Sequence, residues 1–181
     1  LKTISPGAKL EIGPFSVEFI PLTHSIPEMQ ALALRTPLGT ILHTGDWKID
    51  LDPQLGDDIA IERLEALGHE GVLAMVCDST NVFEEGEAGS EATVRAALKD
   101  LIASRSGKVA VTTFASNVAR VESIILAAEA AGRHVCLVGR SMHKVTNAAK
   151  VAGMLNDVED FVDEEEAGFL PPDKILYICT G

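Results

Sequence analysis

The spacing of apolar residues changes along this chain, and the boundary between the two resulting parts is expected near residues 78–90. Up to about residue 50, short strand-like runs are separated by the turn signals Gly13-Pro14 and Pro37-Leu38-Gly39. These signals predict strands within 10–22, with Val17, Phe19 and Leu22 on one face, and a second hairpin over 31–35 and 40–43. The first part is therefore expected to be an antiparallel or mixed sheet.

From residue 58 onward, stretches of helical periodicity alternate with short apolar runs. The first helix is expected to end at Gly68, and Leu98 and Leu101 are expected to face inward from the second. This alternation predicts a parallel sheet with helices on both faces. The predicted helices cover 58–67, 90–104, 117–131 and 141–155, and the predicted buried strands cover 72–77, 108–113, 134–138 and 174–179. The acidic stretch 163–166 is expected to be a solvated loop.

Composition excludes several classes of protein. The chain is 46% hydrophobic, but no apolar run approaches the roughly 20 residues that span a bilayer, and no secretory signal opens it. Its three cysteines lie in separate apolar runs, which favours buried thiols in a reducing cytoplasm over a disulfide framework. The net charge of −12 argues against a simple basic module that coats RNA. Because the chain opens on Leu1 and stops just after an apolar run, we interpret it as a piece of a longer protein.

Polar residues gather where the predicted strands end. In open α/β sheets, residues that handle ligands collect beyond the carboxyl ends of strands. Five strand ends carry such residues: 23–25, 44–46, 78–81, 113–117 and 139–141. His24 and Asp46 are 22 residues apart, a separation that two adjacent antiparallel strands can bridge. An imidazole and a carboxylate suit zinc or manganese, although such a pair is also a common hydrogen-bonded arrangement at a strand end.

Several longer motifs occur in a fixed order along the chain. They are Thr23-His24-Ser25-Ile26-Pro27, 33–39, His43-Thr44-Gly45-Asp46-Trp47-Lys48-Ile49-Asp50, Cys77-Asp78-Ser79-Thr80-Asn81, 113–118 and Gly139-Arg140-Ser141-Met142. In order and spacing they closely resemble ribonuclease J. The earlier motifs are similar to its metallo-β-lactamase domain and the later ones to the β-CASP domain inserted in it. The resemblance implies an α/β fold: the second half of a metallo-β-lactamase αββα domain over 1–80, and part of a β-CASP parallel-sheet domain over 81–181.

The resemblance also implies roles for particular residues. His24 and Asp46 match two metal ligands, and Asp46 matches the aspartate that bridges the metals. Asp78 matches a catalytic acidic residue that orients groups at the edge of the metal site. Two further pairs, at strand-to-helix turns, are expected to contact a phosphate or ribose of RNA: Ser116 with Asn117, and Arg140 with Ser141.

The family's HxHxDH motif is missing from this stretch, because none of the five histidines is spaced as HxH. The family's later histidine motifs are missing as well. A zinc site needs three or four protein ligands, and the chain offers two of the family set. The resemblance implies two zinc ions in the intact enzyme, with manganese or magnesium as alternatives. The piece by itself is expected to hold no metal or a partial complement and to be inactive.

The expected function is that of a metal-dependent RNA phosphodiesterase, endonucleolytic and 5′-to-3′ exonucleolytic, in which two metals activate a water. RNA is the expected partner, with no membrane association. The resemblance implies a cytoplasmic homo-oligomer, either a dimer or a tetramer. One alternative is a non-catalytic RNA-binding or scaffold paralogue. Another is a metal-free nucleotide-binding module, which the absence of GxGxxG and P-loop motifs disfavours.

Overall fold

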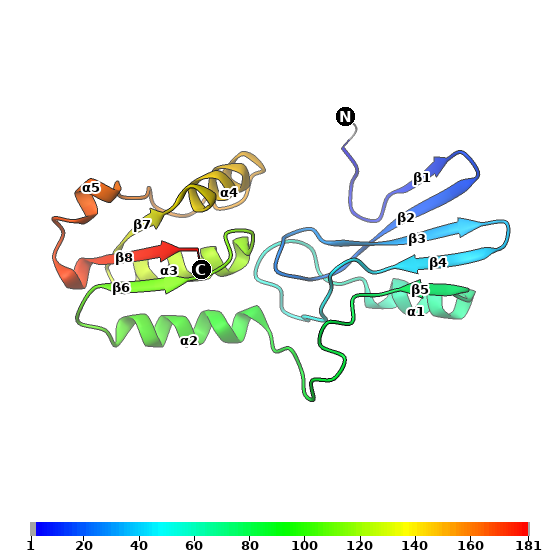
Figure 1. The fold of residues 1–181 in the computed structure, drawn as a ribbon, viewed down its shortest axis with the longest axis horizontal. Coiled ribbons are helices and arrows are strands. Elements are labelled where there is room, and N and C mark those ends of the chain that lie inside the picture. Colours follow the sequence, from blue (N-terminus) through cyan, green and yellow to red (C-terminus); the bar gives the residue numbers. More distant parts are fainter. Residues whose placement is uncertain (1–2, 181) are drawn as a thin grey trace. The chain divides into compact units, whose positions relative to one another are not determined.

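The computed structural model describes residues 3–180. Contacts divide the chain into two compact units, Leu1–Ser90 and Glu91–Gly181, and each has a sheet of its own (Figure 1). The division between the units lies between Ser90 and Glu91, beyond the boundary expected after residue 80. The assignment of 1–80 and 81–181 to two family domains stays a prediction.

The first unit contains a mixed sheet of five strands in the order β1-β2-β3-β4-β5, which lie side by side in Figure 1. The strands are β1 (Lys9–Ile12), β2 (Phe15–Pro21), β3 (Gln30–Thr36), β4 (Gly39–His43) and β5 (Ala74–Val76). The first four pair antiparallel, and β5 pairs parallel to β4. Both predicted hairpins are therefore present. Because β3 runs opposite to its neighbours, β2, β4 and β5 all point the same way.

One helix, α1 (Ile61–Glu70), covers one face of this sheet. Its apolar residues recur at helical spacing, and Ile61, Leu64 and Leu67 pack against the cluster that contains Ile20 and Leu22. The helix runs past Gly68, where we predicted its end, and stops at Gly71, whose φ of 97° suits a residue without Cβ.

Two further expectations for this unit are wrong. Leu22 lies beyond β2 and joins Ile20 in the core beneath α1, so it does not share a face with Val17 and Phe19. Strand β5 is exposed along its whole length, and Met75 is 60% accessible. An apolar run specifies a strand, but its burial depends on what packs against it.

The second unit contains three parallel strands in the order β6-β8-β7. The strands are β6 (Val109–Thr112), β7 (His134–Val138) and β8 (Ile175–Cys179), and the helices are α2 (Glu91–Ala103), α3 (Val118–Ala130), α4 (Arg140–Val151), α5 (Glu164–Ala167) and the 3-10 turn η1 (Pro172–Lys174). The predicted alternation of strand and helix and the parallel pairing are confirmed, and the fold is of the α/β class.

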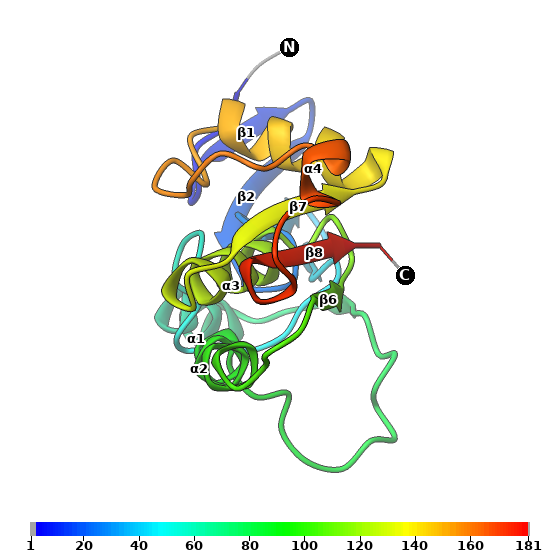
Figure 2. The same cartoon turned by 90° about the vertical axis from the view of Figure 1, so that its left-hand side faces the viewer.

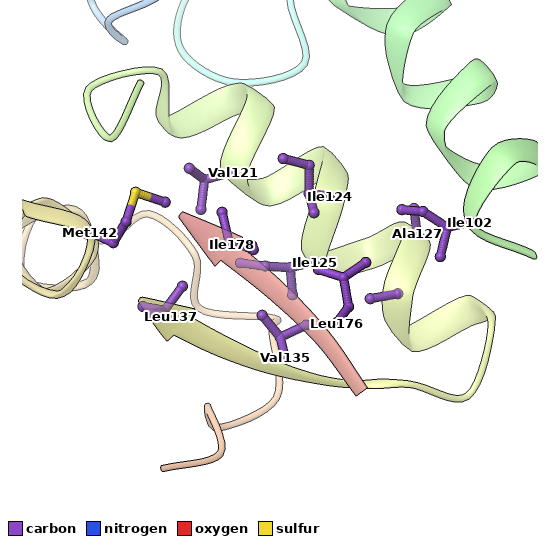
Figure 3. Close-up of a cluster of buried hydrophobic side chains, with 11 residues drawn as sticks. Ile102, Val121, Ile124, Ile125, Ala127, Val135, Leu137, Met142, Leu176 and Ile178 are labelled. Carbon is purple, nitrogen blue, oxygen red and sulfur yellow. The ribbon is translucent and has the colours of Figure 1, made fainter. Parts of the chain in front are cut away.

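The core of this unit lies between α3 and the sheet. Val121, Ile124 and Ile125 of α3 meet Leu176 and Ile178 of β8, together with other side chains labelled in Figure 3. Successive residues of a strand point to opposite faces of the sheet. Cys136 of β7 and Ile175 of β8 therefore pack on the other face, beside α5. Figure 2 shows α3 against the strands of this sheet. Both faces carry a helix, as predicted, but the helix on the second face is the short α5 and not one of the predicted helices.

Two details of this unit differ from the sequence expectations. Leu101 is 50% exposed, whereas its neighbour Ile102 is buried against α3. The stretch predicted to be a loop contains α5, because Asp163 Oδ1 accepts a hydrogen bond from the backbone N–H of Glu165 and so caps the helix. Acidic residues in the first turn then complement the helix dipole. Within residues 3–180, no helix has the length and apolarity that a membrane span requires.

Candidate active site

His24 lies three residues beyond β2, in a segment tied to the one that follows Asp46. Thr23 and Lys48 form an isolated antiparallel bridge. The backbone N–H of Lys48 donates to the Thr23 carbonyl at 2.9 Å, and Thr23 Oγ1 donates to the Lys48 carbonyl at 2.7 Å. The bridge therefore holds His24 beside the segment that carries Asp46. Ser25 Oγ lies 3.1 Å from Nδ1 of the His24 ring.

Asp46 is presented to solvent by a tight turn beyond β4. His43 Nδ1 accepts a hydrogen bond of 3.0 Å from the backbone N–H of Gly45. Gly45 has a φ of 62°, in the left-handed region that favours glycine, and a Cβ there would lie 2.3 Å from Met29 Cε. The turn thus depends on glycine immediately before the candidate ligand.

Asp78 follows β5, and its carboxylate is held by local hydrogen bonds. Asp78 Oδ1 accepts from the Thr80 hydroxyl at 2.5 Å and from the Thr80 backbone N–H at 3.0 Å. These bonds, with a smaller contribution from the charge of His24, lower the pKa of the Asp78 carboxyl.

The three candidates lie at the same end of the sheet because β2, β4 and β5 run in the same direction. The proximity of His24 and Asp46 does not arise from adjacent antiparallel strands, as we expected, because β3 separates β2 from β4. It arises from the bridge between Thr23 and Lys48.

The donor types at this sheet end suit zinc: one imidazole and two carboxylates. Their number and arrangement fall short of a complete site. Across residues 3–180, no group of three or more His, Cys, Asp or Glu side chains is placed to hold a metal ion. His24 and Asp46 could therefore supply part of a coordination shell, and the other ligands would have to come from elsewhere.

A cavity of about 600 Å³ borders this sheet end. Its walls come from the segments 47–51 and 87–90, together with Asn81. Trp47 belongs to the wall, and its Nε1 donates to the Asp78 carbonyl at 3.2 Å. The volume falls in the range typical of sites for small molecules or single nucleotides.

The predicted RNA contacts lie in the second unit. Asn117 is the N-cap of α3, and its Oδ1 accepts from the backbone N–H of Arg120 at 3.0 Å. The side chain of Ser116 is exposed just before it. Asn117 thus satisfies one of the helix's terminal donors with its side-chain oxygen.

Arg140 and Ser141 begin α4 directly after β7, and both are exposed. Because β6 and β7 are parallel to the β8 strand between them, their carboxyl ends meet the same edge of the sheet. The structure therefore places both predicted pairs at one edge. Phe114, 77% exposed, lies at this edge as well.

Sequence reasoning missed three residues that organise the acidic sheet end, namely Thr44, Trp47 and His43. Thr44 Oγ1 accepts from the backbone N–H of Asp78, and Trp47 Nε1 bonds the carbonyl of the same residue. Their positions beside Asp46 were a signal in the sequence. The partner of Trp47 and Thr44, which lies 31 and 34 residues away from them, was not.

Comparison with known proteins gives concordant results. Residues 106–181 match the family described as "Ribonuclease J, beta-CASP domain". A ribonuclease J of Sinorhizobium meliloti is 50% identical over 97% of this chain and 31% of its own length. A ribonuclease J of Thermus thermophilus is 39% identical over the whole chain and 32% of its own length. The chain therefore spans about a third of the length of these relatives.

Among solved structures, the chain resembles a crystal structure titled as a protein of unknown function from Enterococcus faecalis V583. The TM-score is 0.67, with 98% of this chain and 44% of that chain covered. Since the two sequences are 18% identical, this likeness supports the fold alone.

Proposed function

We propose that the parent protein of this chain is a metal-dependent RNA phosphodiesterase, on the premise that the chain is similar to ribonuclease J and that its residues 106–181 match that family's β-CASP domain. The observation that carries the proposal is the convergence of His24, Asp46 and Asp78 at one sheet end. An imidazole and a carboxylate are donor types used in metal-assisted hydrolysis of phosphodiesters, and Asp78 follows a strand that ends at the same side of the sheet.

In this proposal His24 and Asp46 would help to hold two zinc ions, or manganese or magnesium ions. The ions, when bound, supply an activated water and neutralise charge on the phosphate. Further ligands come from parts of the parent outside this chain. Asp78, held ionised by Thr80, acts as a hydrogen-bond acceptor that orients groups at the edge of the metal site.

RNA is the proposed substrate, cleaved both endonucleolytically and from the 5′ end. The exposed Ser116 hydroxyl, the Asn117 amide, the Arg140 guanidinium and the Ser141 hydroxyl offer hydrogen-bond donors to phosphate and ribose oxygens. The free cysteines support a reducing, cytoplasmic setting. Assembly into a dimer or tetramer is part of the same proposal and rests on the resemblance.

The test is Asp46→Ala in the full parent protein. We expect RNA hydrolysis to fall by more than about a hundredfold, because the change removes a proposed ligand rather than an outer partner. Asp57→Ala is the matched control, since it removes an exposed carboxylate from the same unit at a distance in sequence from the three candidates. Circular dichroism of both variants checks that the fold is retained.

Hydrolysis by Asp46→Ala at the wild-type rate would exclude Asp46 from the reaction. If the unsubstituted parent binds RNA but cleaves none in the presence of zinc or manganese, the alternative of a non-catalytic RNA-binding or scaffold paralogue takes its place.

A further inference from the structure

The peptide groups of Asp78 are held on both sides by residues that flank Asp46. Thr44 Oγ1 accepts from the Asp78 backbone N–H at 3.3 Å, and Trp47 Nε1 donates to the Asp78 carbonyl at 3.2 Å. Thr44 lies two residues before Asp46, and Trp47 directly follows it. The two acidic strand ends are therefore joined by a pair of hydrogen bonds that enclose Asp46 along the chain.

Thr44 is suited to this role because its hydroxyl is buried and both donates and accepts a hydrogen bond. The side chain is 4% exposed. A hydroxyl has a single proton, which Thr44 donates to the Gly45 carbonyl at 2.8 Å, and its lone pair receives the N–H of Asp78. One oxygen atom thus connects the turn that presents Asp46 to the start of the segment that carries the Asp78 carboxylate.

Strand pairing alone would hold Asp78 weakly. Strand β5 is only three residues long and exposed throughout, so little packing fixes it. The ladder extends by one bond, from the Thr44 backbone N–H to the Val76 carbonyl at 3.0 Å, and ends there. Because Asp46 and Asp78 carry like charges, repulsion would favour their separation wherever the backbone allows it.

We propose that Thr44 is a positioning residue that fixes the spacing between Asp46 and Asp78, with Trp47 as its second support. The inference rests on the proposed function, since it concerns two residues of that site. Thr44 touches neither substrate nor metal in this role. It acts through the backbone of Gly45 and Asp78.

The experiment compares Thr44→Val and Thr44→Ser in the full parent protein. Valine keeps the branched shape and removes the hydroxyl, whereas serine keeps the hydroxyl and loses a methyl group. The first readout is zinc affinity by competition with a chelator, and the second is kcat and KM for RNA. We expect Thr44→Val to weaken zinc binding about 10- to 100-fold, as loss of an outer-shell partner typically does. Thr44→Ser should stay within about threefold of wild type, because it retains the hydroxyl that links the two segments.

Thr36→Val is the matched control. The Thr36 hydroxyl also donates to a carbonyl, that of Gly39 at 3.0 Å, and accepts from a backbone N–H, that of Leu38 at 3.1 Å. It lies at the opposite end of β4 from Asp46, so its loss should leave zinc affinity unchanged. A similar loss of affinity in Thr36→Val would show that any lost hydrogen bond in the unit suffices, and would overturn the proposal.

If Thr44→Val does not fold, Trp47→Phe decides, because it keeps an aromatic ring and removes the bond to Asp78. Weakened zinc binding in Trp47→Phe supports the proposal, and wild-type affinity overturns it. The two proposals fail in different ways. If Thr44→Val binds zinc as wild type does while Asp46→Ala is inactive, only the positioning role is overturned. If Asp46→Ala is active, the proposed function itself is overturned.

Discussion

The five-stranded sheet buries a carboxylate among arginines, whereas the three-stranded sheet buries an arginine among carbonyl oxygens. Glu18 of β2 is 4% exposed and binds Arg63 of α1 through two bonds, at 2.7 and 2.8 Å, and Arg35 of β3 at 2.7 Å. Glu70 binds both arginines from the far end of α1. This ion cluster fastens α1 to the sheet beneath it.

Arg133 is 3% exposed. Within residues 3–180 its hydrogen-bond partners are backbone carbonyls and include no carboxylate. Its guanidinium donates to the carbonyls of Gly107, Pro172 and Ile175 at 2.9, 3.3 and 3.2 Å, and also to that of Arg105. It therefore ties the segments before β6 and before β8 to the start of β7. The comparison teaches that only one of the two arrangements contains a group that acid can neutralise, so the ion cluster around Glu18 should respond to pH and the carbonyl contacts of Arg133 should not.

The largest effect should come from Arg133→Met, which keeps much of the side-chain volume and leaves several buried carbonyls without a donor. We expect a loss of about 3–5 kcal/mol in the free energy of unfolding of residues 91–181. Hydrogen exchange followed by mass spectrometry would locate the loss in peptides of β7 and β8. Lys99→Met, at an exposed position of α2, is the control, and a comparable loss there would show that the carbonyl contacts of Arg133 are unimportant.

The next effect concerns Glu18 and pH. The hydrogen bonds from Arg63, followed by those from Arg35, lower the pKa of Glu18 from 4.5 to about 2. A depressed carboxyl pKa stabilises the fold above the unfolded value and loses that contribution as pH falls towards the folded value. We therefore expect about 3 kcal/mol of the first unit's stability to be lost between roughly pH 5 and pH 2.

Glu18→Gln should remove this acid dependence and destabilise the first unit at pH 7 by about 3 kcal/mol, because it leaves two arginines without their buried partner. Trp47 is the single tryptophan and lies in this unit, so its fluorescence in urea at several pH values measures the effect. A variant whose stability falls with acid as steeply as that of wild type would assign the titration to another group.

The smallest effect is expected at a surface pair of the second unit. His143 Nε2 and Glu164 Oε1 are 3.9 Å apart, with both side chains more than half exposed. Solvent screens such pairs, so Glu164→Gln should leave the urea midpoint of the second unit unchanged. A clear shift in that midpoint would mean that exposed charges contribute to this unit, and would weaken the contrast between the two sheets.

Periodicity and turn residues were enough to predict most elements, because those signals are local. Val121, Ile124 and Ile125 point inward as their spacing indicates, and the predicted His134–Val138 strand matches β7. Local signals also gave the polar strand ends at which His24, Asp46 and Asp78 lie. The resemblance to ribonuclease J over the whole chain is confirmed by the similarity to the ribonuclease J proteins of two bacteria.

The features that could not be predicted from the sequence, namely the exposure of one strand and several long-range hydrogen bonds, depend on residues far apart in the chain. Nothing local distinguishes the exposed β5 from a buried strand, since both are short apolar runs. The partners of Arg133 are backbone carbonyls 26 to 42 residues away, and any residue could provide them. The same holds for the bonds from Thr44 and Trp47 to Asp78, and for the bridge that brings His24 towards Asp46.

The strand order of the second unit has a consequence for biosynthesis. Among the three strands of this unit that the structure describes, β8 comes after β6 and β7 in the chain, yet it is the central strand to which both of them pair. Until it emerges, β6 and β7 have no ladder between them, and Val135 and Leu137 lack the neighbours Leu176 and Ile178. The nascent chain must therefore carry two unpaired apolar strands until residues 175–179 arrive, an interval during which a chaperone would be of most use.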